Sequence, residues 1–202
     1  MIAIIDYGVG NLFSLRSSLD MIGAESIVTS DPETIRSADK ILLPGVGAFE
    51  DAKRKLSESG LDKLILELVA GGKKIMGICL GMQMLFERSL EYGEHKGLGL
   101  LSGSVIPMQG TIPDGLQIPH IGWNRLNVVS EHPVFKYTKN GDYVYFVHSY
   151  YASGCEDSLL ATTDYGINIT AAVAKDNVAG MQFHPEKSGE CGLNILRAFA
   201  EW

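Results

Sequence analysis

Apolar runs of strand length alternate with amphipathic stretches through the first half of the chain. Residues 2–5 and 74–79 are short and mostly apolar, which is typical of strands buried on both faces of a sheet. Residues 25–29 and 40–43 show weaker strand patterns. Between these runs, apolar residues recur at the spacing of one helix face, in the sets Leu12, Leu15, Leu19 and Ile22; Leu61, Leu64, Ile65 and Leu68; and Met82, Leu85 and Phe86. This alternation predicts a parallel sheet with helices on both faces.

The second half carries strand patterns joined by short turns. They cover residues 125–129, 143–149, 159–163, 169–175 and 178–183. Residues 139–142 (KNGD) are a turn signal, and a helical pattern that begins near Ser188 closes the chain. We therefore expect an α/β fold, with a central, mostly parallel mixed sheet flanked by helices and antiparallel strands in the second half. No repeat or linker interrupts the sequence, so residues 1–202 are expected to form a single domain.

Composition narrows the class of protein. The 202 residues, 46% of them hydrophobic, are enough for one well-buried core. The apolar runs are too short to span a bilayer and the chain shows no signal-peptide pattern, so we expect a cytoplasmic protein with no membrane contact. Three cysteines, Cys79, Cys155 and Cys191, are too few and odd in number for a disulfide framework. The net charge of −7 argues against nucleic acid as a partner.

The segment from Gly77 to Gly81 (GICLG) is the most informative part of the sequence. It has the pattern glycine, any residue, nucleophile, any residue, glycine, with Cys79 as the nucleophile. It lies between an expected buried strand and an expected helix, where the glycines permit a tight turn and the helix start favours thiolate over thiol. Free cysteine is also a common core residue, so the pattern alone leaves a structural Cys79 open.

His184 is the best candidate for the base that a cysteine nucleophile needs. It precedes Pro185 in residues 182–186 (QFHPE), and proline biases the preceding residue toward extended backbone. Residues two apart in an extended segment share a face, so we expect Glu186 beside His184, where it would orient the imidazole. A loop histidine and a solvated carboxylate are the plainer alternatives. The histidines and cysteines lack metal-site spacing, and we expect no metal and no cofactor.

These motifs carry a family resemblance. Residues 77–83 (GICLGMQ) and 183–186 (FHPE) resemble the triad, or class I, glutamine amidotransferases. Further segments make the chain similar to the glutaminase subunits of imidazole glycerol phosphate synthases: residues 6–11 (DYGVGN), 43–49 (LPGVGAF), 119–124 (PHIGWN), 145–150 (YFVHSY) and 181–188 (MQFHPEKS). The resemblance spans the whole chain, and the catalytic positions do not depart from the pattern. It implies the flavodoxin-like fold of class I glutamine amidotransferases.

The resemblance also implies roles for individual residues. The Cys79 thiolate attacks the side-chain amide of glutamine, and His184 protonates the departing ammonia before water hydrolyses the thioester. Backbone N–H groups would stabilise the developing oxyanion, with Leu80, Val46 and Gly47 as the implied donors. Substrate-binding positions implied by the family are Gly45, Gln83, His148, Ser149 and Tyr150. We interpret His95, His120 and His132 as structural.

A second protein is implied because the sequence shows no site for an ammonia acceptor. It has neither a P-loop nor a convincing dinucleotide fingerprint. In the resembled family the acceptor binds a (β/α)8-barrel cyclase subunit, which makes imidazole glycerol phosphate and aminoimidazole carboxamide ribotide in histidine biosynthesis. Interface positions carried over to this chain are Asn11, Trp123, Asn124, Tyr145 and Lys187. Trp123 has the best physical support because aromatic anchors are common at interfaces, although a core tryptophan is the alternative.

Three other functions share parts of this pattern. Another triad amidotransferase, for example one that supplies ammonia to a surface-sugar synthase, would differ only in its acceptor. A cysteine peptidase or α/β hydrolase could use the same elbow, but Gln83 and the LPGVGAF segment argue against it. A non-catalytic binding module would be expected to lack the nucleophile or the base, and both are present.

Overall fold

An eight-stranded mixed sheet forms the centre of the computed structural model, which describes the whole chain, Met1–Trp202. Across the sheet, the strands are β2 (Ser26–Thr29), β1 (Ile2–Ile5), β3 (Lys40–Gly45), β4 (Lys74–Cys79), β14 (Val178–Met181), β13 (Asn168–Lys175), β12 (Leu159–Asp164) and β9 (Asn127–Val128). Strands β2 to β14 in this order run parallel, and β13, β12 and β9 pair antiparallel. The expected mostly parallel sheet with antiparallel strands in the second half is confirmed.

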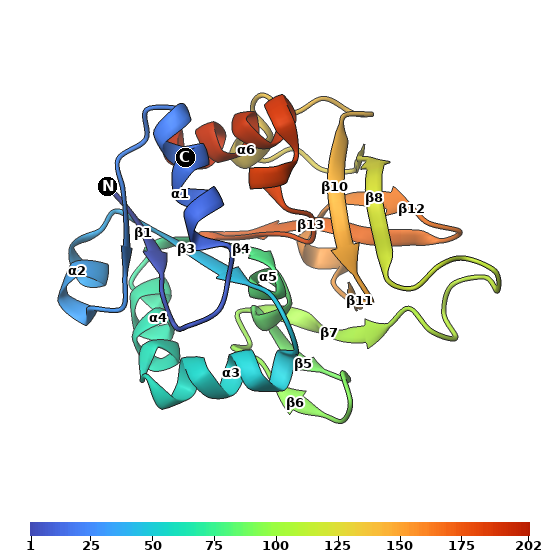
Figure 1. Cartoon of the computed structure of the whole chain (residues 1–202), viewed down its shortest axis with the longest axis horizontal. Coiled ribbons are helices and arrows are strands. Elements are labelled where there is room, and N and C mark those ends of the chain that lie inside the picture. Colours follow the sequence, from blue (N-terminus) through green and yellow to red (C-terminus); the bar gives the residue numbers. More distant parts are fainter.

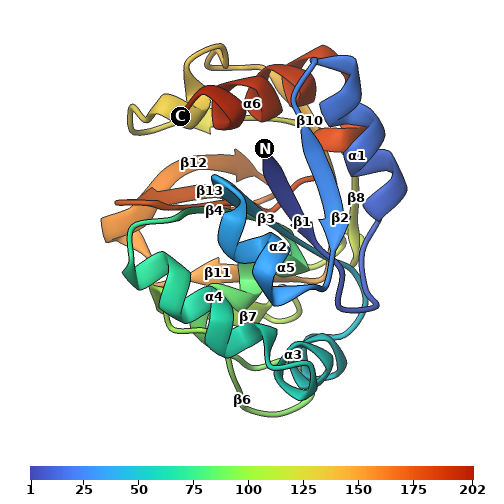
Figure 2. The ribbon, with the colours of Figure 1, turned by 90° about the vertical axis from the view of Figure 1, so that its left-hand side faces the viewer.

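Helices cover both faces of this sheet (Figure 2). One face carries α1 (Leu12–Met21) and α6 (Gly189–Glu201); the other carries α3 (Phe49–Glu58), α4 (Leu61–Ala70) and α5 (Leu80–Met84), and the short α2 (Pro32–Ser37) lies beside α4. Each face has its own hydrophobic cluster, of 27 buried residues on the α3–α5 side and 23 on the α1–α6 side. Burying one large apolar side chain contributes about 1.5–3 kcal/mol, so the two clusters hold the layers together.

Two smaller sheets complete the fold, one to the right of the central sheet and one below it in the view of Figure 1. Strand β10 (Tyr143–His148) pairs antiparallel with β8 (His120–Arg125). The other sheet has the order β11 (Tyr150–Ser153), β7 (Leu101–Pro107), β5 (Phe86–Ser89) and β6 (His95–Lys96). Three short 3-10 helices are η1 (Pro133–Phe135), η2 (Glu156–Ser158) and η3 (Pro185–Lys187). The smaller sheets stand beside the carboxyl end of β4, where they supply walls for a site.

The structure corrects two elements that the sequence pattern predicted. The helix expected to contain Met82, Leu85 and Phe86 ends at Met84, and Phe86 opens strand β5. A short apolar run is compatible with a helix or a strand. Here the pairing with β7 stabilises the strand. The single strand expected over residues 125–129 is also wrong, because the chain leaves β8 at Arg125, turns through Leu126 and enters the central sheet as β9. The pattern also missed β5, β6, β7, β11, α2 and nearly all of β8.

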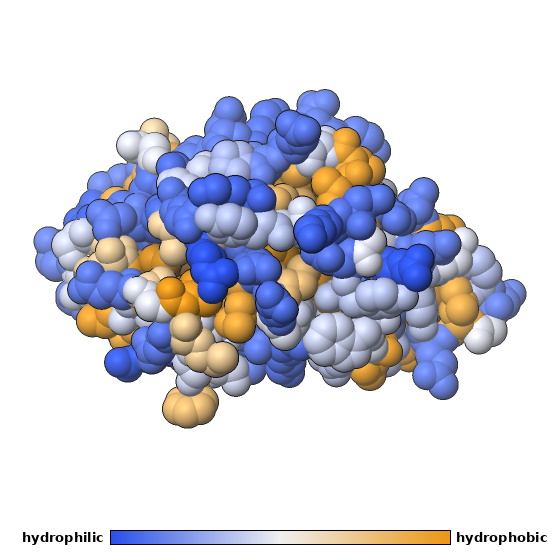
Figure 3. All heavy atoms as spheres, turned by 90° about the horizontal axis from the view of Figure 1, so that it is seen from above, coloured by the Kyte–Doolittle hydropathy of each residue, from blue (hydrophilic) through white to orange (hydrophobic).

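None of the helices combines the length and the apolar character that a membrane-spanning segment needs. The face that carries α1 and α6 is mostly hydrophilic, with small, scattered hydrophobic patches (Figure 3).

Candidate active site

Three neighbouring strands end at the same edge of the central sheet. Strand β4 ends at Cys79, which lies level with Gly45 at the end of β3. On the other side, Ile78 pairs with Met181 at the end of β14, and His184 follows three residues later. In open α/β sheets, ligands bind outside the carboxyl ends of the strands. This edge therefore brings the expected nucleophile and base together.

Cys79 occupies a strained turn between β4 and α5. Its backbone angles, φ 54° and ψ −112°, are ones that non-glycine residues rarely adopt. The flanking glycines are required by close packing, since a Cβ on Gly81 would lie 1.8 Å from Leu43 O and one on Gly77 would lie 2.6 Å from Gly81 O. The turn is thus the nucleophile elbow that the sequence predicts. Helix α5 has only five residues, so its electrostatic support for a thiolate is weaker than a long helix would give.

His184 and Glu186 form a buried pair beside Cys79. Nδ1 of His184 lies 2.8 Å from Oε1 of Glu186, and the two side chains are 4% and 3% exposed. His184 has the extended backbone expected before Pro185, with φ −100° and ψ 99°. The expectation that the extended segment continues to Glu186 is wrong, because the chain turns into η3 directly after His184 and Lys187 N donates to His184 O. The turn still brings the two side chains together, so the expected contact exists through a different backbone shape.

The electrostatics of His184 suit an ion pair with the cysteine. Burial alone would lower the pKa of His184, but its interactions with the neighbouring Cys79 and with Glu186 outweigh burial and raise it to about 10. Glu186 holds Nδ1 of His184, which leaves Nε2 available for chemistry at the neighbouring cysteine. A protonated imidazole held next to Cys79 stabilises the thiolate, the form of cysteine that attacks carbonyl carbon.

A cavity of about 390 Å³ opens in front of Cys79. Its lining consists of Val46, Gly47, Cys79, Leu80, Gln83, Glu91, Pro119, Val147, His148, Ser149, Tyr150, His184 and Lys187. A cavity of this size accommodates an amino acid. The structure therefore gathers all the expected oxyanion and substrate residues here except Gly45, which packs against the backbone of Gly81 behind the turn.

Gln83 presents an acceptor to this cavity. Its amide nitrogen Nε2 donates to Tyr150 O and to Gln182 Oε1, both at 3.0 Å, which uses both of its hydrogens. Its oxygen Oε1 has no partner within the protein hydrogen-bond network. Gln83 is thus arranged to accept a hydrogen bond from a ligand that carries an N–H group.

His148 lines the cavity, but its two ring nitrogens are engaged within the protein. Nδ1 lies 2.9 Å from Tyr150 O and must donate, so Nε2 accepts from His120 Nδ1 at 3.2 Å. Burial lowers the pKa of His148 to about 3 and that of His120 to about 4, so both rings are neutral near pH 7. His120 also stacks on Phe146 and Tyr165. This pair supports the cavity wall, and the structural interpretation of His120 fits its contacts.

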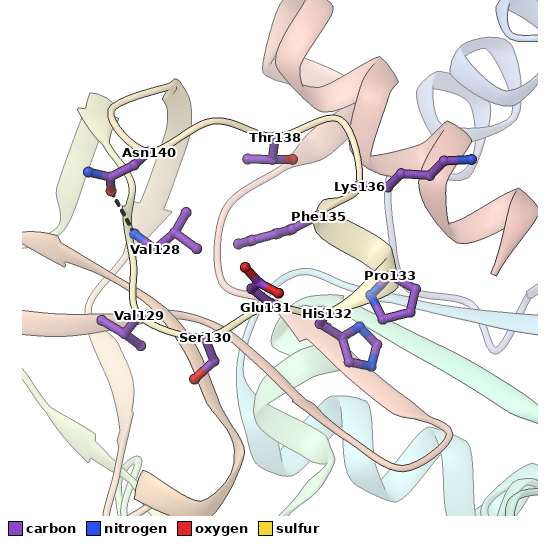
Figure 4. Close-up of a pocket in the computed structure, with 10 residues that line it drawn as sticks. All are labelled: Val128, Val129, Ser130, Glu131, His132, Pro133, Phe135, Lys136, Thr138 and Asn140. Atoms are coloured by element: carbon purple, nitrogen blue, oxygen red, sulfur yellow. Dashed lines mark hydrogen bonds between the residues drawn. The ribbon is translucent and has the colours of Figure 1, made fainter.

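A larger hollow, of about 760 Å³, lies away from the triad. The loop from Val128 to Asn140 surrounds it, and a hydrogen bond from Val128 N to Asn140 Oδ1 closes the loop (Figure 4). Phe135 points inward and Lys136 extends away from the hollow (Figure 4). No strained residue or triad member lines it, so we place the active site in the smaller cavity.

Comparison with known proteins shows the family to which the chain belongs. The family model of class-I glutamine amidotransferases matches residues 3–201. The imidazole glycerol phosphate synthase subunit HisH of Caldanaerobacter subterraneus subsp. tengcongensis is 50% identical over 202 residues, covering 100% of this chain and 98% of the relative. HisH of Bacillus subtilis is 48% identical, covering 100% of this chain and 96% of the relative. The chain belongs to the HisH family of class-I glutamine amidotransferases.

Solved structures agree with this fold. A glutamine amidotransferase crystal structure superposes with a TM-score of 0.77 at 18% identity, with full coverage of both chains. The glutaminase domain of Trypanosoma brucei CTPS, solved with bound acivicin, gives a TM-score of 0.65 at 16% identity and covers 99% of this chain and 93% of that chain. The expected class I glutamine amidotransferase fold is confirmed, and at this level of identity these likenesses show the fold alone.

Three of the expected interface residues form a group at the mouth of the HisH-family site. Trp123 is 53% exposed, and its ring lies 6.1 Å from that of Tyr145. Lys187 Nζ lies 5.7 Å from the Tyr145 ring and also borders the cavity. Asn124 does not join this group, because the side chains of successive residues in strand β8 point to opposite faces. Its side chain therefore points away from that of Trp123, and its Nδ2 donates to Asp164 O. Asn11 lies apart, beside Glu186 on the other side of the triad.

Sequence reasoning missed Glu91, the only acidic residue that lines the cavity. Its Oε2 accepts a 2.5 Å hydrogen bond from Phe49 N at the start of α3, directly after the Val46–Gly47 segment. Glu91 lies in a turn after β5, and no local motif marks it. The pairing of β5 with β7 and β6 places this turn at the cavity. Only the tertiary structure therefore identifies Glu91 as a residue of the site.

Proposed function

We propose that this chain hydrolyses glutamine at Cys79 as the glutaminase subunit of an imidazole glycerol phosphate synthase, in histidine biosynthesis. Membership of the HisH family supports the activity and the pathway. The observation that carries the residue assignment is the strained Cys79 elbow facing a buried His184–Glu186 pair. Nucleophile, base and orienting carboxylate stand in the order that cysteine acyl transfer requires.

The proposed reaction has two covalent steps. The Cys79 thiolate adds to the amide carbon of glutamine, the C–N bond breaks, and Nε2–H of His184 protonates the leaving nitrogen to give ammonia. Neutral His184 then takes a proton from water, whose oxygen adds to the thioester carbon. The C–S bond breaks, glutamate leaves, and the thiolate and imidazolium are restored. Glu186 keeps Nδ1 of His184 bound throughout, so that Nε2 serves both steps.

Backbone N–H groups at the elbow are the proposed oxyanion donors. Leu80 is the first residue of α5, and the first N–H groups of a helix have no partner within it. Val46 and Gly47 line the cavity opposite, and Gly47 has a φ of 90°, which glycine adopts at little cost. We propose that the loaded partner completes the oxyanion hole near Val46, so that glutamine hydrolysis accelerates only in the assembled enzyme.

Gln83 and Glu91 account for the selection of glutamine. The free Oε1 of Gln83 suits the N–H groups of a carboxamide and disfavours the carboxylate of glutamate, which helps the product leave. Glu91 supplies a negative charge for the α-ammonium group of the substrate.

Glu91→Gln is expected to raise the KM for glutamine by about tenfold or more, because a hydrogen bond to a charged group contributes about 1.5–3 kcal/mol. Glutamine at this position still offers an oxygen to Phe49 N, so the substitution removes the charge and spares the start of α3. Steady-state kinetics of the assembled enzyme measure the effect. Glu94→Gln is the matched control, since Glu94 pairs with Arg88 at the surface. An unchanged KM in Glu91→Gln would show that Glu91 does not bind the ammonium.

We propose that ammonia passes directly to a cyclase subunit, the (β/α)8 barrel of the synthase, in a cytoplasmic heterodimer. The cavity in front of Cys79 is the one that the proposed nucleophile and base line, and the resembled family places the ammonia acceptor on the cyclase subunit. The group of Trp123, Tyr145 and Lys187 beside the cavity mouth offers an exposed aromatic anchor and a cation to such a partner. Lys187 adjoins Glu186, so its partner contact would also reach the triad.

Reconstitution tests this function. The chain is mixed with the barrel cyclase and its phosphoribulosyl formimino aminoimidazole carboxamide substrate, with glutamine as the nitrogen source. We expect imidazole glycerol phosphate and glutamate in equal amounts, and a glutaminase rate well above that of the chain alone. Equal glutaminase rates with and without the loaded cyclase would refute activation by the partner. A different synthase is indicated if glutamine is hydrolysed but no imidazole glycerol phosphate forms, while added ammonia does allow the cyclase to make it.

A further inference from the structure

The sulfur of Cys79 lies between one hydrogen-bond acceptor and one donor. The carbonyl oxygen of Val147 lies 3.9 Å away and can only accept, so it favours the thiol. The amide nitrogen Nε2 of Gln182 also lies 3.9 Å away and can only donate, so it favours the thiolate. Gln182 is the only side chain that donates a hydrogen bond to this sulfur in the structure.

The orientation of the Gln182 amide is set by its neighbour Gln83. Gln182 Oε1 accepts from Gln83 Nε2 at 3.0 Å, which directs Gln182 Nε2 toward Cys79. Gln83 is itself held by its second hydrogen bond, to Tyr150 O. A reversed Gln182 amide would place two donors against each other and turn an oxygen toward the sulfur. The network therefore allows one orientation.

Burial strengthens this contact. Gln182 is 0% exposed, and Gln83 and Cys79 are the only hydrogen-bond partners of its side chain. Without the sulfur, its NH₂ group would be a buried donor without an acceptor, which is costly. Hydrogen bonds to an ionised group are the stronger kind, and a low local dielectric increases their strength.

We propose that Gln182 is a further catalytic residue, whose amide donates a hydrogen bond to the Cys79 thiolate. This inference rests on the proposed glutaminase reaction. The hydrogen bond increases the population of thiolate before attack. It also stabilises the thiolate as it departs when water hydrolyses the thioester, because a better-stabilised thiolate is a better leaving group. Glutamine binding itself does not use Gln182, which does not line the cavity.

Gln182→Met tests the inference, since methionine fills a similar volume without a donor. In the assembled enzyme, kcat for glutamine hydrolysis is expected to fall about tenfold while KM changes less than about threefold, as the loss of one hydrogen bond to a charged group implies. Alkylation of Cys79 by iodoacetamide gives a second measurement that needs no glutamine. The rate of alkylation should also fall about tenfold, because only the thiolate reacts and one hydrogen bond to it is lost.

Thr163→Val is the matched control. Thr163 is also 0% exposed, and its hydroxyl donates to Arg125 O away from the sulfur. Loss of that buried hydrogen bond should leave the alkylation profile unchanged, which separates a general loss of stability from an effect on Cys79. If Gln182→Met does not fold, Gln83→Met applies the same alkylation test, because it frees the Gln182 amide to rotate.

Two results overturn different claims. If the wild-type enzyme hydrolyses glutamine but the alkylation profile and the kcat of Gln182→Met are unchanged, the proposed role of Gln182 is wrong. The proposed glutaminase activity then still stands. A wild-type assembled enzyme with no glutamine hydrolysis overturns the proposed function itself. Ammonia-dependent synthesis by each variant complex confirms that the variant still folds and assembles.

Discussion

Cys79→Ala is expected to lower glutamine-dependent synthesis by ~10⁴-fold or more, since removing a nucleophile from a catalytic triad abolishes the covalent route. Ammonia-dependent synthesis by the same complex should remain, because the cyclase carries out that step. Alanine fits the elbow without added bulk, and the triad partners His184 and Glu186 stay paired with each other. The variant therefore separates chemistry at Cys79 from folding and assembly.

The measurement compares the rate of product formation from glutamine with the rate from ammonium salt on the same preparation. Cys155→Ala is the matched control, because Cys155 is also a buried free cysteine and its sulfur contacts Thr170, outside the active site. It should retain both activities. If Cys79→Ala still makes product from glutamine, Cys79 is not the nucleophile and another residue carries out glutamine hydrolysis.

The elbow was predictable because its cause is local. Gly77 and Gly81 are needed where α5 packs back on β3 and β4, and these contacts lie within a few residues of Cys79 or on the neighbouring strand. The main sheet was predictable for a similar reason, since buried parallel strands are continuous apolar runs. His184 and Glu186 were found because proline and a two-residue spacing mark them, although the backbone between them is a 3-10 turn.

Glu91 and Gln182 show what the sequence pattern could not provide. Glu91 reaches the cavity only because β5 joins a sheet with β7, and the pattern suggested a helix at Phe86. Gln182 was visible as part of QFHPE, but its contact with Cys79 depends on Gln83, which is 99 residues away in sequence. Contacts between distant segments set the direction of an amide, and single-sequence periodicity carries no information about that direction.

Glu186→Gln is expected to lower kcat for glutamine hydrolysis by ~10³–10⁴-fold, the scale seen when a triad carboxylate becomes an amide. The carboxylate is 3% exposed, and its charge acts on His184 at 2.8 Å with little screening by water. An amide at this position can hold the ring, but it offers no negative charge to the imidazolium. The thiolate–imidazolium pair would therefore be less populated.

The pH profile distinguishes this electrostatic role from a merely structural one. Cys79 and Glu186 raise the pKa of His184 to about 10 despite burial, so wild-type activity should fall on the basic side only as pH approaches that value. Removing the negative charge lowers the pKa of His184, and the basic limb of kcat/KM should move to lower pH. Glu190→Gln, an exposed neighbour in the first turn of α6, should leave the limb in place. A Glu186→Gln profile with an unmoved basic limb would mean that Glu186 only positions the ring, and that Cys79 alone keeps His184 protonated.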